Sequence, residues 1–326
     1  MNELSIHIYT KADELPSGLR RENIFHSPQL FELCLQTPRH RPYMLTVEDG
    51  QGQVLAQLLA LVRYRSSWFP PYFYMHCRVY GEGEYAPDVE SKDRLFGMML
   101  SELTRQLRRR LLYIEVSNLS QKMFAYRQLR QDGFFPVRWM SIHNSLHSRT
   151  PEERISEKLY KRIGHARTRG IVTKTVETAD EFHAFSRLLH HHNWFKPRRY
   201  IPHDDFFRGM LRQGRCKIFI TKFHERVIGC TVCVYSGKDA YLWYTASRRK
   251  SYAPLHPNAV TIWETICHAH AAGYDHIRFL DVGLPYRKNP YRDFILRFGG
   301  KEVSTYRWFR ISIRWVNTLA SWLWRE

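Results

Sequence analysis

The later parts of the two halves of the chain have the same order of predicted strands and helices. In each half a pair of strands precedes a long amphipathic helix. A strand ending in a carboxylate, a second helix, a glycine and a further strand follow. Two pairs of residues keep one spacing of 166 (281 − 115 and 299 − 133): Glu115 with Asp281, and Gly133 with Gly299. This favours two copies of one unit, although glycine after a helix is also a common stop signal.

A unit of this order predicts a mixed α/β sheet with helices on both faces. Ligands of such sheets bind where strands end, often at the N-terminus of the next helix. Asp281 lies at the carboxyl end of the strand predicted over 276–283, and Glu115 is its counterpart in the first half. Both acids are therefore candidate functional residues.

The length of 326 residues exceeds what one ordinary core accommodates, and 44% of the residues are hydrophobic. We predict an N-terminal domain over 1–148 and a C-terminal domain over 149–310. A final helix is predicted over 311–326 and is expected to pack on the first domain. The alternative is a position at a membrane surface, because the C-terminal segment mixes tryptophans with arginines, as interfacial helices do: Trp308, Trp315, Trp322 and Trp324.

The six cysteines are scattered through mostly apolar runs, which indicates reduced, buried thiols and not a disulfide framework. The N-terminus lacks the apolar run of a signal peptide. No stretch in the first half approaches the ~20 apolar residues that cross a bilayer. We expect a soluble cytoplasmic protein, with a peripheral position on the inner face of the membrane as an option.

The net charge is +19, and residues 151–326 hold 31 of the 50 basic residues but only 16 of the 31 acidic ones. So cationic a half favours phosphate-bearing partners, such as nucleic acid, a nucleotide or a membrane surface. A solvated basic face that maintains solubility is the alternative.

The residues from Pro257 to Gly283 resemble a pattern of the Fem-type aminoacyltransferases, which have tandem acetyltransferase (GNAT) domains and add amino acids to peptidoglycan precursors. The shared features are Pro-Asn, a tryptophan, a helix ending in Ala-Ala-Gly, and an acid on the next strand. DFILRFGG (293–300) resembles the family's F-K-x-x-F-G signature, and the basic helix over 158–170 resembles the one that opens its second domain. The resemblance implies two tandem GNAT-like domains, the first degenerate and on the acceptor side.

The chain departs from the family at two places. Ile295 stands where the signature has a lysine implicated in handling the aminoacyl donor; Arg297 and Lys288 are nearby cations that could replace it. The glycine-rich pyrophosphate loop of ordinary acetyltransferases is missing from residues 247–259. This second departure counts against simple acetyl-CoA chemistry.

The reaction that the resemblance implies is attack of an amine on an activated ester or thioester. It requires a neutral amine, a donor to the developing oxyanion and cations for the phosphates of the donor. Asp281 could deprotonate the amine or could cap a turn, and Glu115 is a weaker candidate for the same role. The Tyr244 hydroxyl could act as general acid or oxyanion donor, although core packing is the more ordinary role. Tyr241 and Trp243 are predicted on one strand face and Tyr244 on the other.

Several cations are candidates for binding the donor. Arg248, Arg249 and Lys250 precede a helix whose predicted N-cap is Asn258, so that helix dipole and cations would act together. Arg287 and Lys288 form a second cationic loop. On the helix that opens the second half, a basic stripe has spacings of four and seven residues: Lys158, Arg162 and Arg169.

We predict no metal site. His190, His191 and His192 are consecutive, and neighbouring helical side chains diverge by about 100°, so the three cannot converge on one ion. Cys230 and Cys233 lie three apart on a predicted strand and so face opposite sides of the sheet, which argues against a zinc or redox site.

The leading hypothesis is acyl or aminoacyl transfer to an amine, by resemblance from aminoacyl-tRNA to an anionic cell-wall precursor. An N-acyltransferase using acyl-CoA and a non-catalytic binder of anionic polymer or membrane are the alternatives. No permanently bound cofactor is expected; the donor would be aminoacyl-tRNA or acyl-CoA.

Overall fold

The computed structural model describes residues 4–67, 71–108, 110–194, 200–280 and 282–324. The chain forms two compact units. Unit 1 comprises residues 1–139 and 304–326, and unit 2 comprises residues 140–303.

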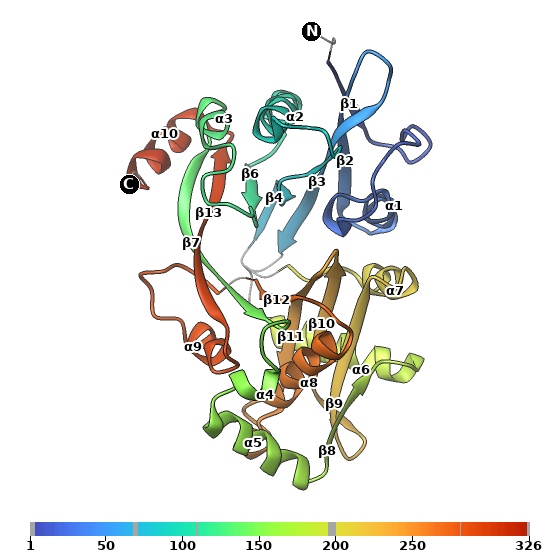
Figure 1. Ribbon diagram of the computed structural model, residues 1–326, viewed down its shortest axis with the longest axis vertical. Helices are drawn as coiled ribbons and strands as arrows, with labels where there is room; N and C mark the ends of the chain where they lie inside the picture. Colours follow the sequence, from blue (N-terminus) through green and yellow to red (C-terminus); the bar gives the residue numbers. More distant parts are fainter. Residues whose placement is uncertain (1–3, 68–70, 109, 195–199, 281, 325–326) are drawn as a thin grey trace. The chain divides into compact units, whose positions relative to one another are not determined.

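Unit 1 is a mixed sheet in the order β1-β2-β3-β4-β6-β13-β7, with the short β5 pairing with β3 (Figure 1). Its core lies between the sheet and α2 and α3, and includes Phe96, Leu103 and Leu129. The long amphipathic helix predicted in the first half is observed as α2, which buries Leu95, Met99, Leu103 and Leu107 at helical spacing. The elements are β1 (Ser5–Tyr9), η1 (Ile24–His26), α1 (Pro28–Gln36), β2 (His40–Glu48), β3 (Val54–Ser67), β4 (Tyr72–Tyr80), β5 (Glu84–Tyr85), α2 (Lys92–Leu107), β6 (Tyr113–Ser117), α3 (Tyr126–Gln131), β7 (Phe135–Ser145), β13 (Lys301–Ile311) and α10 (Arg314–Leu323).

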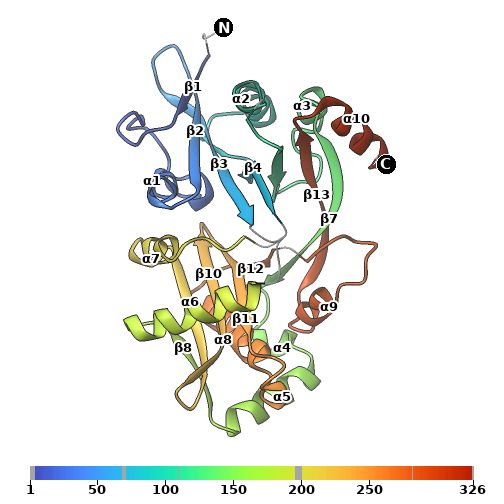
Figure 2. The same cartoon turned by 180° about the vertical axis from the view of Figure 1, so that it is seen from behind.

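Unit 2 is a sheet in the order β7-β12-β11-β10-β9-β8. Figure 1 shows α8 in front of this sheet and Figure 2, from behind, shows α6, so the two helices cover opposite faces. Trp263 and Ile266 of α8 lie in the core beneath it. The elements, besides β7, are α4 (Pro151–Arg154), α5 (Glu157–Thr168), β8 (Ile171–Thr175), α6 (Ala179–Asn193), α7 (Asp204–Arg212), β9 (Cys216–Phe223), β10 (Arg226–Ser236), β11 (Asp239–Ser247), η2 (Ala253–Leu255), α8 (Pro257–Ala271), β12 (His276–Phe279) and α9 (Pro290–Leu296).

Each unit contains the same crossover. In unit 1, β4 pairs in parallel with β6 across α2; in unit 2, β11 pairs in parallel with β12 across α8. Gly133 and Gly299, which follow α3 and α9, have φ values of 80° and 88°, which glycine adopts without a Cβ clash. The predicted mixed α/β architecture with a duplicated unit is therefore confirmed.

Two strands run through the division between the units. The second half of β7 pairs with β12 in unit 2, and the second half of β13 pairs with β6 in unit 1. The units thus divide inside β7 and β13, after Trp139 and after Val303. The domain boundaries predicted at 148/149 and 310/311 stay a prediction. The C-terminal segment from residue 304, with α10 and the part of β13 after Val303, is grouped with unit 1.

The sequence pattern grouped Trp308 with the tryptophans of the C-terminal helix, but the structure places it elsewhere. It lies on β13, fully buried in the core of unit 1, while Trp315 and Trp322 of α10 are exposed. The six cysteines are free thiols, five of them buried and Cys267 half-buried. No helix in the described part of the chain is long and apolar enough to cross a membrane.

Candidate functional site

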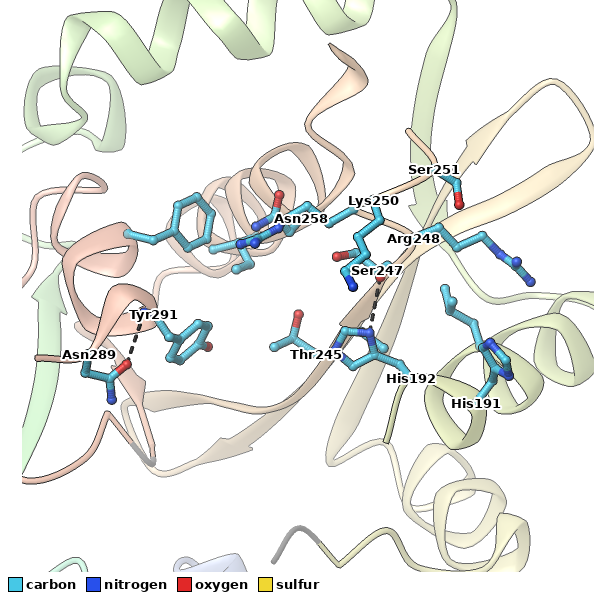
Figure 3. A pocket seen from close by; sticks show the side chains of 15 residues that line it. His191, His192, Thr245, Ser247, Arg248, Lys250, Ser251, Asn258, Asn289 and Tyr291 are labelled. Atoms are coloured by element: carbon cyan, nitrogen blue, oxygen red, sulfur yellow. Dashed lines mark hydrogen bonds between the residues drawn. The ribbon is translucent and has the colours of Figure 1, made fainter. Parts of the chain in front are cut away.

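A pocket of about 840 Å³ lies in unit 2 at the carboxyl end of β11. Its walls are the end of α6, the end of β11 with the loop after it, the first turns of α8, and α9 (Figure 3). The polar residues that line it are His191, His192, Thr245, Ser247, Arg248, Arg249, Lys250, Ser251, Asn258, Asn289 and Tyr291. The apolar part of the wall includes Leu188, Ile262 and Phe294.

The loop after β11 carries the three predicted phosphate-binding cations, and all three line the pocket. The loop is held by its backbone: Arg248 N donates to Ile228 O (2.8 Å), and Tyr252 N donates to Arg248 O (3.1 Å). The buried Nε of Arg248 has no hydrogen-bond partner among the described residues. A buried guanidinium N–H without a partner is costly, which makes it a donor suited to an incoming anion.

The N-terminus of α8 adds further donors. The sequence predicted Asn258 as the N-cap of this helix, and this prediction is wrong. The N-cap is His256, in the left-handed conformation (φ 43°), and Pro257 occupies the first turn. Proline favours the first helical position, because its fixed φ suits the helix and it has no N–H to leave unpaired. Asn258 is therefore inside the first turn and still lines the pocket. The positive end of the helix dipole reinforces an anion site here.

Two residues of the basic stripe, Arg162 and Arg169, act on the same helix end. Burial lowers the pKa of His256, and the charges of Arg162 and Arg169 lower it further. These two arginines, on α5 and at its C-cap, thus lie close to the α8 N-terminus. Lys158 is exposed on α5, which packs against α8 and η2. The structure brings together two cation groups that the sequence suggested separately.

A β-bulge lies in β11 beside the pocket. Val232 faces Tyr244 and Cys233 faces Leu242, so Trp243 is an extra residue opposite β10. Because of the bulge, Trp243 and Tyr244 lie on one side, their rings stacked 5.6 Å apart against Phe206 and Phe207 of α7. The alternation predicted for these residues is therefore wrong. Tyr244 is buried in aromatic packing and does not line the pocket.

The end of β11 has an open edge toward the pocket. Its parallel pairing with β12 runs from Asp239 to Leu242, because β12 ends at Phe279. In the described part of the chain, no strand pairs with residues 243–247 on that side. Thr245, Ala246 and Ser247 line the pocket. Backbone groups on this edge are positioned to hydrogen-bond an extended ligand or a developing oxyanion.

Two histidines at the end of α6 line the pocket, and sequence reasoning had considered them only as metal ligands. His192 Nδ1 lies 3.2 Å from Ser247 O (Figure 3). A carbonyl only accepts, so Nδ1 carries the proton in the neutral ring and Nε2 carries the lone pair. His191 is exposed at the pocket rim. Among the described residues, no group of three His, Cys, Asp or Glu side chains is arranged to hold a metal ion.

A chain of buried hydroxyls fixes α8 on the sheet. Thr261 Oγ1 lies 2.5 Å from Thr221 Oγ1 and 2.6 Å from Pro257 O, and Thr265 Oγ1 lies 2.7 Å from Thr231 Oγ1. Gly229 of β10 allows this approach, because a Cβ there would lie 2.4 Å from Thr261 Oγ1. The first turn of α8, with Asn258, is thereby held at a fixed place beside the pocket.

The cations of the second predicted loop do not line the pocket. Arg287 and Lys288 are exposed, and Arg297 is the C-cap of α9, where its carbonyl accepts from Ser156 N (2.8 Å). Asn289 caps α9 and donates to Val282 O (2.6 Å), which fixes the turn that places Tyr291 and Phe294 at the pocket. Ile295, at the position of the family's lysine, is fully buried core.

The two predicted acids have different outcomes. Asp281 lies outside the described residues. Glu115, on β6 of unit 1, is buried between two guanidinium groups, with Arg78 and Arg307 each 3.5 Å from its Oε1. Arg307 in turn stacks on Trp139, 3.9 Å from the ring centroid. Glu115 therefore belongs to an ion cluster of unit 1 and not to the pocket.

Residues 153–288 match the family described as acetyltransferase (GNAT) domain. The matched range contains β11 with its bulge, the cationic loop and α8. No curated protein sequence matches the chain.

Solved structures resemble nearly the whole chain. FemX has a TM-score of 0.64 at 11% identity, covering 92% of this chain and 94% of its own. L-PGS from Bacillus licheniformis has 0.59 at 11%, covering 92% of each chain. A tandem GNAT protein from the clavulanic acid biosynthesis pathway has 0.59 at 12%, covering 95% and 99%. At these identities the likeness establishes the fold: two tandem GNAT-like units, as predicted.

Proposed function

We propose that this protein transfers an acyl or aminoacyl group from a phosphate-bearing donor to an amine, and that the unit 2 pocket binds the donor. The observation that carries the proposal is the set of anion-binding groups in one pocket: Arg248 with a buried unpartnered Nε, the cations beside it and the first turn of α8. Phosphates of the donor bind there, because charge-assisted donors and a helix N-terminus act together.

The reactive end of the donor lies along the open edge of β11. An acyl or aminoacyl carbonyl placed beside residues 243–247 receives a backbone N–H bond that strengthens as the oxyanion develops. The amine attacks this carbonyl and forms the amide, the C–O or C–S bond of the donor breaks, and the proton taken from the amine is returned to the leaving oxygen or sulfur. No covalent intermediate with the protein is required.

His192 is the proposed acceptor of the amine proton. Its Nδ1–H donates to Ser247 O, which fixes the tautomer with the lone pair on Nε2, and the residue lines the pocket. An imidazole is suited to this role near neutral pH. Asp281 stays a prediction for the same role.

Aminoacyl-tRNA is the proposed donor, with an amine of a cell-wall precursor as acceptor. The support is the resemblance to Fem-type enzymes, the similarity to the FemX structure, and the charges of Arg162 and Arg169 near His256, in addition to the cations of the pocket loop. Together these cations exceed what one pyrophosphate requires and suit a polynucleotide. Acyl-CoA is the second candidate, because the matched domain is described as an acetyltransferase.

The test is equilibrium binding of aminoacyl-tRNA and of acyl-CoA across a salt series. The variants are a pocket reversal (Arg248→Glu, Arg249→Glu and Lys250→Glu) and a matched reversal of three exposed cations, Arg212, Lys217 and Lys238, near the opposite ends of the same strands. The pocket reversal is expected to weaken donor binding by at least about 100-fold, roughly 2.7 kcal/mol. The matched reversal carries the same charge change and is expected to lower affinity far less.

The outcomes separate the hypotheses. Saturable tRNA binding that survives ~0.15 M salt supports the aminoacyl proposal. Saturable acyl-CoA binding, displaced by free coenzyme A, assigns the second donor instead. Equal loss in both reversal variants would mean a general charge effect and would reject the pocket as the donor site, as would no binding of either donor.

A further inference from the structure

Helix α10 presents an apolar face that the rest of unit 1 leaves uncovered. None of its residues, 314–323, is buried. Trp315 is 71% exposed and Trp322 is 62% exposed, and Leu319 and Leu323 are exposed beside them. At about 100° per residue, Trp315, Leu319 and Trp322 point within roughly 60° of one another, so they form one stripe.

The opposite side of α10 is fastened to unit 1. Asn317 Nδ2 donates to Gly133 O (2.9 Å), and Asn317 Oδ1 accepts from Ile311 N (2.8 Å). Figures 1 and 2 both show α10 beside α3. Asn317 lies about half a helical turn from the centre of the stripe. The hydrogen bonds therefore hold the helix with its tryptophans turned outward.

Arginines surround the start of this helix. Arg314 lies in the first turn of α10 and Arg310 at the end of β13; burial lowers the pKa of Arg310, and the charges of Arg108 and Arg314 lower it further. Arg108 and Arg314 are exposed. Asp132 is the acid near them; its backbone carbonyl accepts from Arg310 Nε (2.9 Å). The helix itself contains no acidic residue.

We infer that α10 docks unit 1 on an anionic lipid surface. Tryptophan is the side chain that prefers the boundary between headgroups and acyl chains, and Leu319 and Leu323 would enter the apolar layer beside it. Arg108 and Arg314, which are exposed, complement the negative headgroups. The arginines near the start of α10 favour a membrane over a second copy of this chain as the partner. A symmetric contact between two copies would bring these like charges together. The inference does not depend on the proposed function.

The experiment is co-sedimentation of the full chain with vesicles of phosphatidylglycerol and phosphatidylcholine (3:7), and with pure phosphatidylcholine. Three proteins are compared: wild type, the double variant Trp315→Ser with Trp322→Ser, and Trp194→Ser. Trp194 is 77% exposed in unit 2, outside the stripe, and serves as the matched control. Both substitutions remove exposed rings, so folding is expected to be unaffected.

Wild type and Trp194→Ser are expected to bind the anionic vesicles at least tenfold more tightly than pure phosphatidylcholine. The double variant is expected to lose at least tenfold of that affinity. Absence of wild-type binding, or equal binding by the double variant, would overturn the inference. So would a concentration-dependent dimer in solution that the double variant abolishes, since the stripe would then be a protein interface.

Discussion

Gly229→Ala is expected to displace the first turn of α8 and to destabilise unit 2. The new Cβ would lie 2.4 Å from Thr261 Oγ1 and 3.1 Å from Pro257 O. Thr261 cannot turn away cheaply, because its hydroxyl bonds both Pro257 O and Thr221 Oγ1. Overpacking of this kind costs about 1–3 kcal/mol. With a central value of about 2 kcal/mol, the melting temperature should fall by about 4–8 °C.

A second substitution tests the stated cause. Thr261→Ala alone loses two buried hydrogen bonds and should cost about 1–2 kcal/mol. In the double variant the clashing oxygen is gone, and the nearest atom to the new Cβ is Pro257 O. The double variant should therefore be more stable than the sum of the single variants predicts, by about 1–2 kcal/mol.

The assays are calorimetric melting and donor binding, with Gly164→Ala as control. Gly164 lies in α5, and a Cβ there would meet no atom within 4 Å. Alanine is the better helix former, so this control should be neutral or stabilised by up to about 1 kcal/mol. Gly229→Ala should also weaken donor binding, because Asn258 moves with the helix. Unchanged melting of Gly229→Ala, or additive single effects, would refute the reasoning.

Three further predictions concern ionisable groups. His192→Gln should lower the transfer rate at least about 100-fold and remove the acid limb of the pH–rate profile. His191→Gln should leave the rate and the acid limb unchanged. Equal effects of the two substitutions would exclude His192 as the base. Burial lowers the pKa of His26 from 6.5 to about 3. The unfolded chain therefore binds the proton first, and stability should fall as pH drops below 6.5, by about 2 kcal/mol at pH 5. Urea unfolding of wild type and His26→Gln at pH 7.5 and pH 5 measures this; an identical pH dependence would contradict it. Glu115→Gln should cost about 3 kcal/mol, because Arg78 and Arg307 lose their buried counter-charge, and should leave donor binding unchanged; loss of donor binding by the folded variant would place Glu115 in the function.

The site was partly predictable because its cations follow one another in the chain. Arg248, Arg249 and Lys250 lie between a strand and a helix, so the sequence could suggest an anion site. Trp243 and Tyr244 were misassigned because a single extra residue shifts the side-chain alternation of a strand. Nothing in the local sequence signals that bulge, because it is a property of the register between β10 and β11, which shifts between Val232 and Cys233.

His192 shows what pairing across space adds. Three consecutive histidines suggested at most a metal site, and helix geometry predicted that they do not converge on one ion. The role of His192 depends on Ser247, which lies on another element and supplies the carbonyl that fixes the tautomer. Tyr291 and Asn289 reach the pocket in the same way, through the turn that Asn289 holds against Val282.

By itself the sequence determined the local features of this protein: the duplicated order of strand, helix and strand, the buried face of α2, the glycines that end helices, and the cationic loop. These features depend on residues that are neighbours in the chain, where propensity and hydrophobic period act. The tertiary structure decided three features: the way β7 and β13 divide between the two units, the bulge in β11, and the convergence of α6, α8 and α9 on one pocket. Those outcomes depend on strand register and on contacts between distant segments, whose energies no local pattern records.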